Sequence, residues 1–113
     1  MIQLKLTKDK FIAIINVVTV ITQALDKQLA GMKRDMKFAR VRSDISVLQE
    51  LSRKMRSKYV MMEDKEGNHR VTLSVNEIQA FVIMYYRDID KQEAYNSAVL
   101  HEISDTIFQN LLT

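Results

Sequence analysis

The chain has 113 residues, of which 47% are apolar, and it contains no Cys, no Pro and only two Gly. A chain of this length is expected to form one domain over residues 1–113, with enough buried surface for a core that needs no cross-links. The lack of Cys excludes a disulfide framework and a thiolate zinc site. The scarcity of Pro and Gly favours long helices.

The N-terminal residues predict a short strand followed by a long apolar helix. Ile2, Leu4 and Leu6 alternate with polar residues, which is typical of a strand over 2–6 with one buried face. Thr7 is a candidate N-cap for a helix over 8–31, which is apolar nearly all round and should be covered on more than one side. Its β-branched residues leave a buried strand over 14–21 as the alternative.

The N-terminal segment also has a pattern similar to that of a signal peptide, because three lysines precede its apolar run. One acidic and three polar residues argue against that interpretation: Asp9, Asn16, Thr19 and Thr22. They also make a membrane span improbable on composition. We expect a cytoplasmic protein that does not contact a membrane.

A second helix is predicted over 33–58. Its apolar stripe consists of Val41, Ile45, Leu48, Met55 and Tyr59. One unbroken helix through Gly31 is the alternative, since glycine costs only about 1 kcal/mol there. At 100° per residue the stripes of the two segments project to nearly opposite sides of such a rod. A turn near Gly31 brings both stripes to one core, so a helical hairpin is favoured.

The C-terminal half predicts a β-hairpin and then a long helix. The hairpin covers 59–73, with strands at 59–62 and 69–73 and a charged turn at 63–68. Ser74 and Glu77 have the spacing of a capping box, which opens a helix over 75–112 of about 55 Å. A break with a new cap at Asp90 is the alternative.

Together these elements predict an α+β, helix-dominated fold in the order β-α-α-β-β-α. Three long helices would pack with a small sheet formed by the N-terminal strand and the β-hairpin. The strand–cap–helix pattern occurs twice, over 4–15 and 71–82.

Apolar residues of the 75–112 segment recur at alternating spacings of four and three, which is the spacing of coiled-coil interfaces. Ile78, Val82 and Tyr85 begin this row. Two interpretations stay open, namely packing within the chain and self-association. The candidate self-association residues are Ile89, Gln92, Tyr95, Asn96, Val99 and Ile103.

Segment 33–58 carries nine Lys or Arg and three acidic residues, although the whole chain has a net charge of only +3. Cations near a helix N-terminus are disfavoured by the helix dipole, so the first cluster is a functional hint. A solvated basic face, nucleic acid and an acidic protein partner are the three interpretations. The candidate anion-contacting residues are Lys33, Arg34, Lys37, Arg40 and Arg42.

Signals for catalysis or metal binding are weak. His101 and Asp105 have helical i, i+4 spacing, but two ligands without a third are common by chance. The serines have no neighbouring histidine base, and neither Gly belongs to a phosphate-binding motif. We therefore expect no catalytic, cofactor or metal site.

The sequence favours a non-catalytic helical protein that self-associates as a homodimer and acts as an interaction or structural module. The alternative is an accessory protein that binds nucleic acid through basic segment 33–58.

Overall fold

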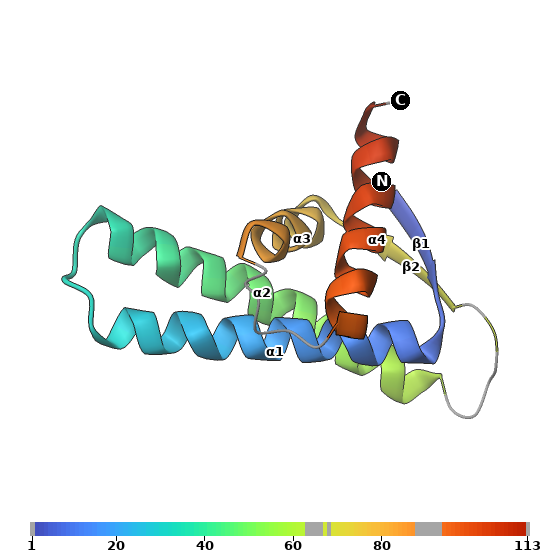
Figure 1. Cartoon of the computed structure of the whole chain (residues 1–113), viewed down its shortest axis with the longest axis horizontal. Coiled ribbons are helices and arrows are strands. Elements are labelled where there is room, and N and C mark those ends of the chain that lie inside the picture. The colour runs from blue at the N-terminus through green and yellow to red at the C-terminus, as the bar shows by residue number, and fades with distance from the viewer. Residues whose placement is uncertain (1, 63–66, 68, 88–93, 113) are drawn as a thin grey trace.

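The computed structural model describes residues 2–62, 67, 69–87 and 94–112. It shows a helix-dominated α+β fold, as predicted, with four helices and two strands in the described residues (Figure 1). The elements are β1 (Ile2–Leu6), α1 (Lys8–Ala30), α2 (Met36–Met61), β2 (His69–Leu73), α3 (Val75–Arg87) and α4 (Ala94–Leu112). The order β-α-α-β-α-α differs from the predicted one in its second half.

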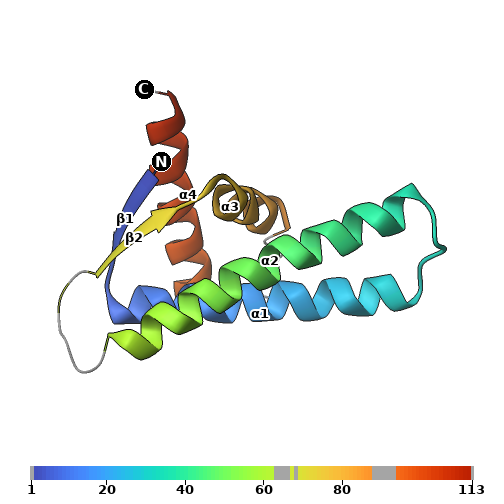
Figure 2. The same ribbon diagram turned by 180° about the vertical axis from the view of Figure 1, so that it is seen from behind.

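Helices α1 and α2 form the predicted helical hairpin and lie side by side in both views (Figures 1 and 2). The Thr7 hydroxyl caps α1 by accepting from the Lys10 N–H at 3.4 Å. Asp35 caps α2, because its Oδ1 accepts from the N–H groups of Lys37 at 3.0 Å and Phe38 at 3.2 Å. The second helix therefore begins at Met36 rather than at residue 33.

The predicted β-hairpin over 59–73 is wrong. Tyr59, Val60 and Met61 continue α2 as helix, and β2 pairs with β1 instead. The two strands are antiparallel, with Ile2 opposite Leu73 and Leu6 opposite His69. The α1–α2 hairpin returns the chain to β1, so a long-range pairing replaces the local one. Of the predicted turn, residues 63–66 and 68 lie outside the described residues.

The predicted single helix over 75–112 is two helices, α3 and α4, which pack against each other at a steep angle (Figures 1 and 2). A rod of about 55 Å would exceed the longest dimension of the fold, which is 46 Å. Two shorter helices instead let α4 pack on α1 while α3 packs mainly on α2. Residues 88–93, which include the predicted break, lie outside the described residues.

Helix α1 is central and contacts α2, α3, α4 and β1, which confirms that it is covered on more than one side. The largest fully buried side chains come from all four helices and from β2. They are Phe11, Ile14, Ile45, Leu48, Leu51, Met55, Leu73, Phe81, Met84 and Leu100. By length and composition alone α1 is also a candidate membrane span. The core helix of a soluble protein can pass the same test, and α1 packs against four other elements of this fold.

A buried carboxylate joins α2 to the start of α3. The Ser74 N–H donates to Glu77 Oε1 at 3.0 Å and the Glu77 N–H donates to Ser74 Oγ at 3.3 Å, which confirms the predicted capping box. Lys54 Nζ of α2 donates to both Glu77 oxygens, at 2.7 and 2.8 Å, and also to the Thr72 carbonyl. This cluster ties α2, β2 and α3 together at one point.

Two further ion pairs hold the C-terminal helices against the hairpin. Lys10 of α1 contacts Glu102 of α4 at 2.7 Å, and Arg87 of α3 contacts Asp44 of α2 at 3.2 Å. Glu102 is 58% exposed and Asp44 is 17% exposed, so the first pair lies at the surface and the second is more sheltered.

Candidate interaction surface

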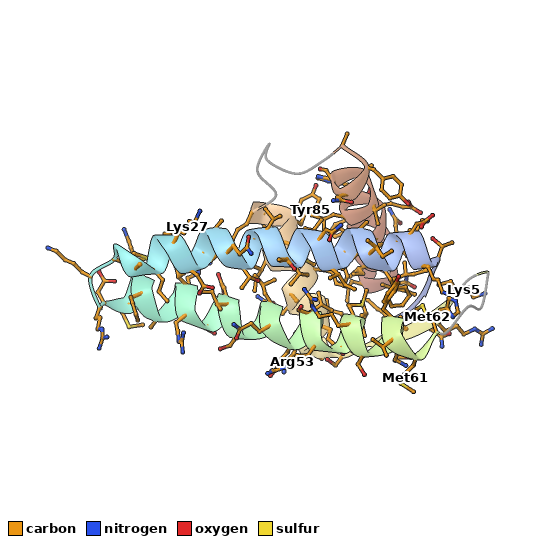
Figure 3. The ribbon with its side chains drawn as sticks, turned by 90° about the horizontal axis from the view of Figure 1, so that it is seen from below. Lys5, Lys27, Arg53, Met61, Met62 and Tyr85 are labelled. Carbon is orange, nitrogen blue, oxygen red and sulfur yellow. The ribbon has the colours of Figure 1, made fainter. Side chains whose placement is uncertain are left out.

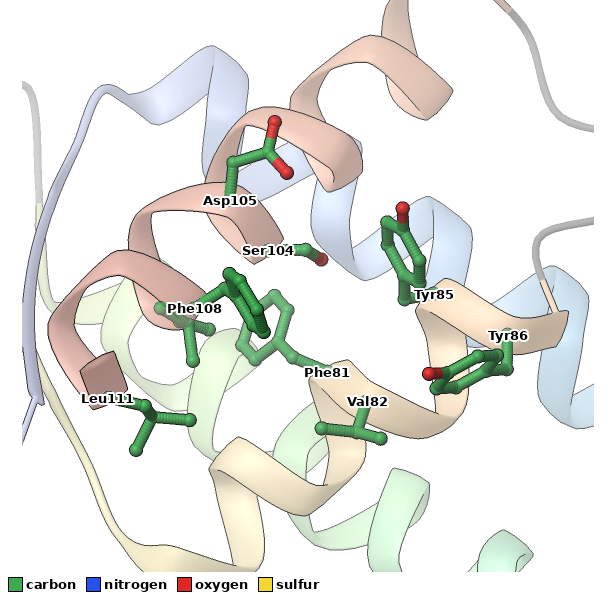
Figure 4. A pocket seen from close by; sticks show the side chains of 9 residues that line it. Phe81, Val82, Tyr85, Tyr86, Ser104, Asp105, Phe108 and Leu111 are labelled. Atoms are coloured by element: carbon green, nitrogen blue, oxygen red, sulfur yellow. The ribbon is translucent and has the colours of Figure 1, made fainter.

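An apolar groove runs between α3 and α4 and encloses about 500 Å³ (Figure 4). Both helices contribute walls, and aromatic rings dominate the lining. We call this feature the α3–α4 groove. Its lining residues are Phe81, Val82, Tyr85, Tyr86, Ser104, Asp105, Ile107, Phe108 and Leu111.

The wall from α3 follows from six successive apolar or aromatic residues at 81–86. Successive helical positions differ by 100°, so one core cannot bury all six. Phe81, Ile83 and Met84 enter the core, whereas Val82 and Tyr85 are partly exposed and Tyr86 is 82% exposed. The groove wall is the part of this run that the fold leaves uncovered.

The wall from α4 is apolar toward its C-terminal end and polar one turn earlier. Ile107 is buried, while Phe108 and Leu111 are each 59% exposed. Figure 4 shows the Phe108 ring beside that of Phe81. Ser104 and Asp105 supply the polar edge of the groove.

Ring contacts support the tyrosines of the groove. Tyr85 meets Tyr86 edge-on, with ring centroids 5.7 Å apart and an interplanar angle of 87°. Tyr85 also meets the His101 ring, with ring centroids 5.0 Å apart and an interplanar angle of 67°. Edge-to-face pairs of this kind are favourable geometries, and rings with few rotatable bonds lose little entropy when a partner covers them.

The predicted self-association residues divide into three groups. Tyr95 is exposed, whereas Asn96, Val99 and Ile103 are buried within the chain's own core. Ile89 and Gln92 lie outside the described residues. The predicted coiled-coil row assumed one continuous helix. Because α4 lies at an angle to α3, the second half of the row faces the core. Its first half, Val82 and Tyr85, does lie in the α3–α4 groove.

The predicted anion-contacting residues gather around the connection between α1 and α2, which we call the hairpin tip (residues 32–42). All five are exposed: Lys33, Arg34, Lys37, Arg40 and Arg42. The tip projects away from the sheet and α4 (Figures 1 and 2). Among the described ion pairs none includes these five residues.

The rest of the basic segment is partly engaged within the fold. Lys54 binds Glu77, and Arg56 donates to the hydroxyls of Thr19 and Ser52, both at 3.1 Å. Arg53 and Lys27 lie on different helices at opposite edges of the hairpin in Figure 3. Segment 33–58 therefore presents a basic tip rather than one continuous basic wall.

The described residues contain no group of three or more His, Asp or Glu side chains placed to hold a metal ion. His101 packs on Tyr85, and Asp105 lies at the edge of the groove. These contacts give both residues a place in the groove region.

Sequence reasoning missed Phe108 and Leu111 as parts of a surface shared with Tyr86. Their exposure and their common groove depend on how α3 crosses α4, which no local pattern encodes. Comparison of the chain with protein-family models, curated proteins and solved structures finds no match.

Proposed function

We propose that this chain is a non-catalytic interaction protein that self-associates through the α3–α4 groove. The observation that carries the proposal is the exposure of Tyr86, Phe108 and Leu111 around one cavity of about 500 Å³. Helical proteins commonly form such grooves where an apolar partner segment docks.

The exposed area supports an interaction role. An aromatic side chain can bury about 150–250 Å², so the exposed parts of Tyr85, Tyr86 and Phe108, with Val82 and Leu111, amount to roughly 500 Å². That area is close to the largest apolar patches on monomeric proteins, about 300–600 Å², which are often functional. With a polar rim it approaches the roughly 800 Å² that each partner contributes to a standard interface.

The composition of the groove supports the same role. Tyr and Phe are enriched at the centres of protein interfaces, and a few such side chains carry most of the binding energy. Here they lie together and are braced by neighbouring rings. A polar edge at Ser104 and Asp105 gives a partner hydrogen-bonding and charged contacts.

Sedimentation velocity over a wide concentration range tests the proposal. The wild-type chain should exceed the monomer mass of 13.2 kDa as concentration rises. A variant with Tyr86→Asp and Phe108→Asp should raise the dissociation constant by about 100-fold or more, because it places charge in the interface centre.

Val60→Asp is the matched control, since Val60 is 77% exposed on α2 and does not line the groove. It should associate as the wild type does. Circular dichroism of all three proteins confirms that each is folded. A wild-type chain that stays monomeric at every concentration refutes the proposal.

Nucleic-acid binding is the second candidate, and the exposed basic residues of the hairpin tip are the observation that favours it. Such binding would weaken as salt concentration rises, because phosphate contacts release counterions. Replacing Lys33, Arg34, Lys37, Arg40 and Arg42 with Gln should then abolish it. Binding that survives this replacement excludes the tip as the contact.

A further inference from the structure

We infer that the occupant of the α3–α4 groove is the hairpin tip of a second copy of this chain. The inference rests on the proposed self-association and names the two surfaces that meet. Each copy presents both surfaces, the tip and the groove, at different places on the fold (Figures 1 and 4). The contact is therefore between unlike surfaces of two copies.

The tip presents a side chain that suits an aromatic groove. It projects beyond the body of the molecule, and Met36 on it is 83% exposed. A methionine side chain is unbranched and adapts to irregular cavities, and its sulfur makes favourable contacts with aromatic rings. Tyr85, Tyr86 and Phe108 supply such rings.

Charge complementarity selects the same pair of surfaces. Helix α4 carries two acidic residues, Glu102 and Asp105, and no Lys or Arg. Asp105 lines the groove and makes no ion pair with any other residue that the structure describes. The tip carries five exposed cations, and its one acidic residue before α2, Asp35, is occupied as the N-cap of that helix.

Charge also disfavours the simplest alternative, a dimer in which groove faces groove. That arrangement would bring two copies of α4 together, each with Asp105 at the edge of the contact. Like charges that face each other across an interface are unfavourable, and they suppress incorrect pairing. A basic tip instead provides the opposite charge.

A second copy accounts for more of the observations than nucleic acid does. Phosphates would neutralise the cations but leave Met36 and the groove without a role. The aromatic residue of the tip, Phe38, is half-buried with the Arg34 guanidinium 5.9 Å from its ring centroid. It is thus not presented as a stacking platform for bases.

Complementation between two association-deficient variants tests the inference. The tip variant carries Met36→Asp, Lys37→Glu and Arg40→Glu, all at exposed positions, and keeps an intact groove. The groove variant carries Tyr86→Asp and Phe108→Asp and keeps an intact tip. Each alone should associate about 100-fold more weakly than the wild type.

An equimolar mixture should form a one-to-one complex, because one chain supplies a tip and the other supplies a groove. Sedimentation velocity with one chain fluorescently labelled detects this complex. Labelled groove variant mixed with unlabelled groove variant is the control and should stay monomeric. Val60→Asp mixed with either variant should behave as wild type does.

Three outcomes separate the two proposals. If the tip variant self-associates as strongly as the wild type, the groove binds another surface, and this inference is overturned while self-association stands. A wild-type chain that is always monomeric overturns both. If a DNA duplex binds the wild type but not the tip variant, and the tip variant still self-associates, the tip is a polyanion site and the inference fails.

Discussion

Glu77 shows how one buried side chain depends on all its neighbours. Burial by itself raises the pKa of this carboxyl group. The hydrogen bonds from Lys54, from the Ser74 N–H and from the Ser74 hydroxyl, with the attraction of the Lys54 charge, outweigh burial and hold the pKa below its usual range. The ionised form of Glu77 is therefore the form that the fold stabilises.

A stability that depends on pH follows. The folded-state pKa of Glu77 is lower than the unfolded one, so its contribution is complete above the unfolded pKa, about 4.3, and is lost as pH falls through the folded value. Glu77→Gln should lower the free energy of unfolding near neutral pH by about 1–2 kcal/mol. Urea denaturation at a series of pH values measures this difference.

Below the usual pKa of a glutamate the difference between wild type and Glu77→Gln should shrink, because protonation removes the same interactions. Glu50→Gln is the control, since Glu50 is exposed on α2 and should change little at any pH. A difference that stays constant across the pH series would show that the Glu77 charge does not stabilise the fold.

At the scale of elements, the turn between α1 and α2 depends on a cap rather than on glycine. Gly31 has φ −100°, which any residue can adopt, and a Cβ there would have only the Gln28 carbonyl as a neighbour, at 3.9 Å. Asp35, in contrast, satisfies two N–H groups at the start of α2. The sequence pointed to Gly31, whereas the hydrogen bonds point to Asp35.

Substitutions at Gly31 and Asp35 should therefore have opposite effects on the stability of the fold. Gly31→Ala should leave the protein unchanged or stabilise it by up to about 1 kcal/mol, because it restricts the unfolded chain. Asp35→Ala should destabilise it by about 1 kcal/mol, which corresponds to a loss of about 4 °C in Tm. Thermal denaturation of both variants measures the change in Tm. A larger loss of Tm for Gly31→Ala than for Asp35→Ala would show that the turn depends on glycine and not on the cap.

Local patterns predicted those elements whose signal lies within a few residues. Thr7 and the Ser74–Glu77 pair cap helices as their spacing indicated, because capping is a contact between neighbours in sequence. The run Tyr59–Met61 was misassigned because a short run of apolar residues fits strand and helix equally well. The pairing of β1 with β2 was beyond local reasoning, since Leu4 and Val71 meet only after the helical hairpin has formed.

At the scale of the molecule, the apolar run at 81–86 explains why the sequence predicted only part of the α3–α4 groove. When six successive residues are all apolar, hydrophobicity alone does not indicate which face of the helix is buried. Val82 and Tyr85 therefore fit the core as well as Phe81 and Met84 do. The packing of α3 on α2 and the crossing of α4 determine which face of α3 is buried. Val99 and Ile103 then become core residues, and the groove takes the place of the predicted coiled-coil surface.

The central claim is that the α3–α4 groove is covered when copies of this chain meet. Oxidative footprinting at low and high protein concentration tests it directly, because exposed aromatic rings are modified and covered ones are not. The account predicts that Tyr86 and Phe108 become protected as concentration rises, while Tyr59 at the far end of α2 keeps a constant rate. Equal modification of Tyr86 and Phe108 at both concentrations, in a sample that sedimentation shows to be associated, would contradict the claim.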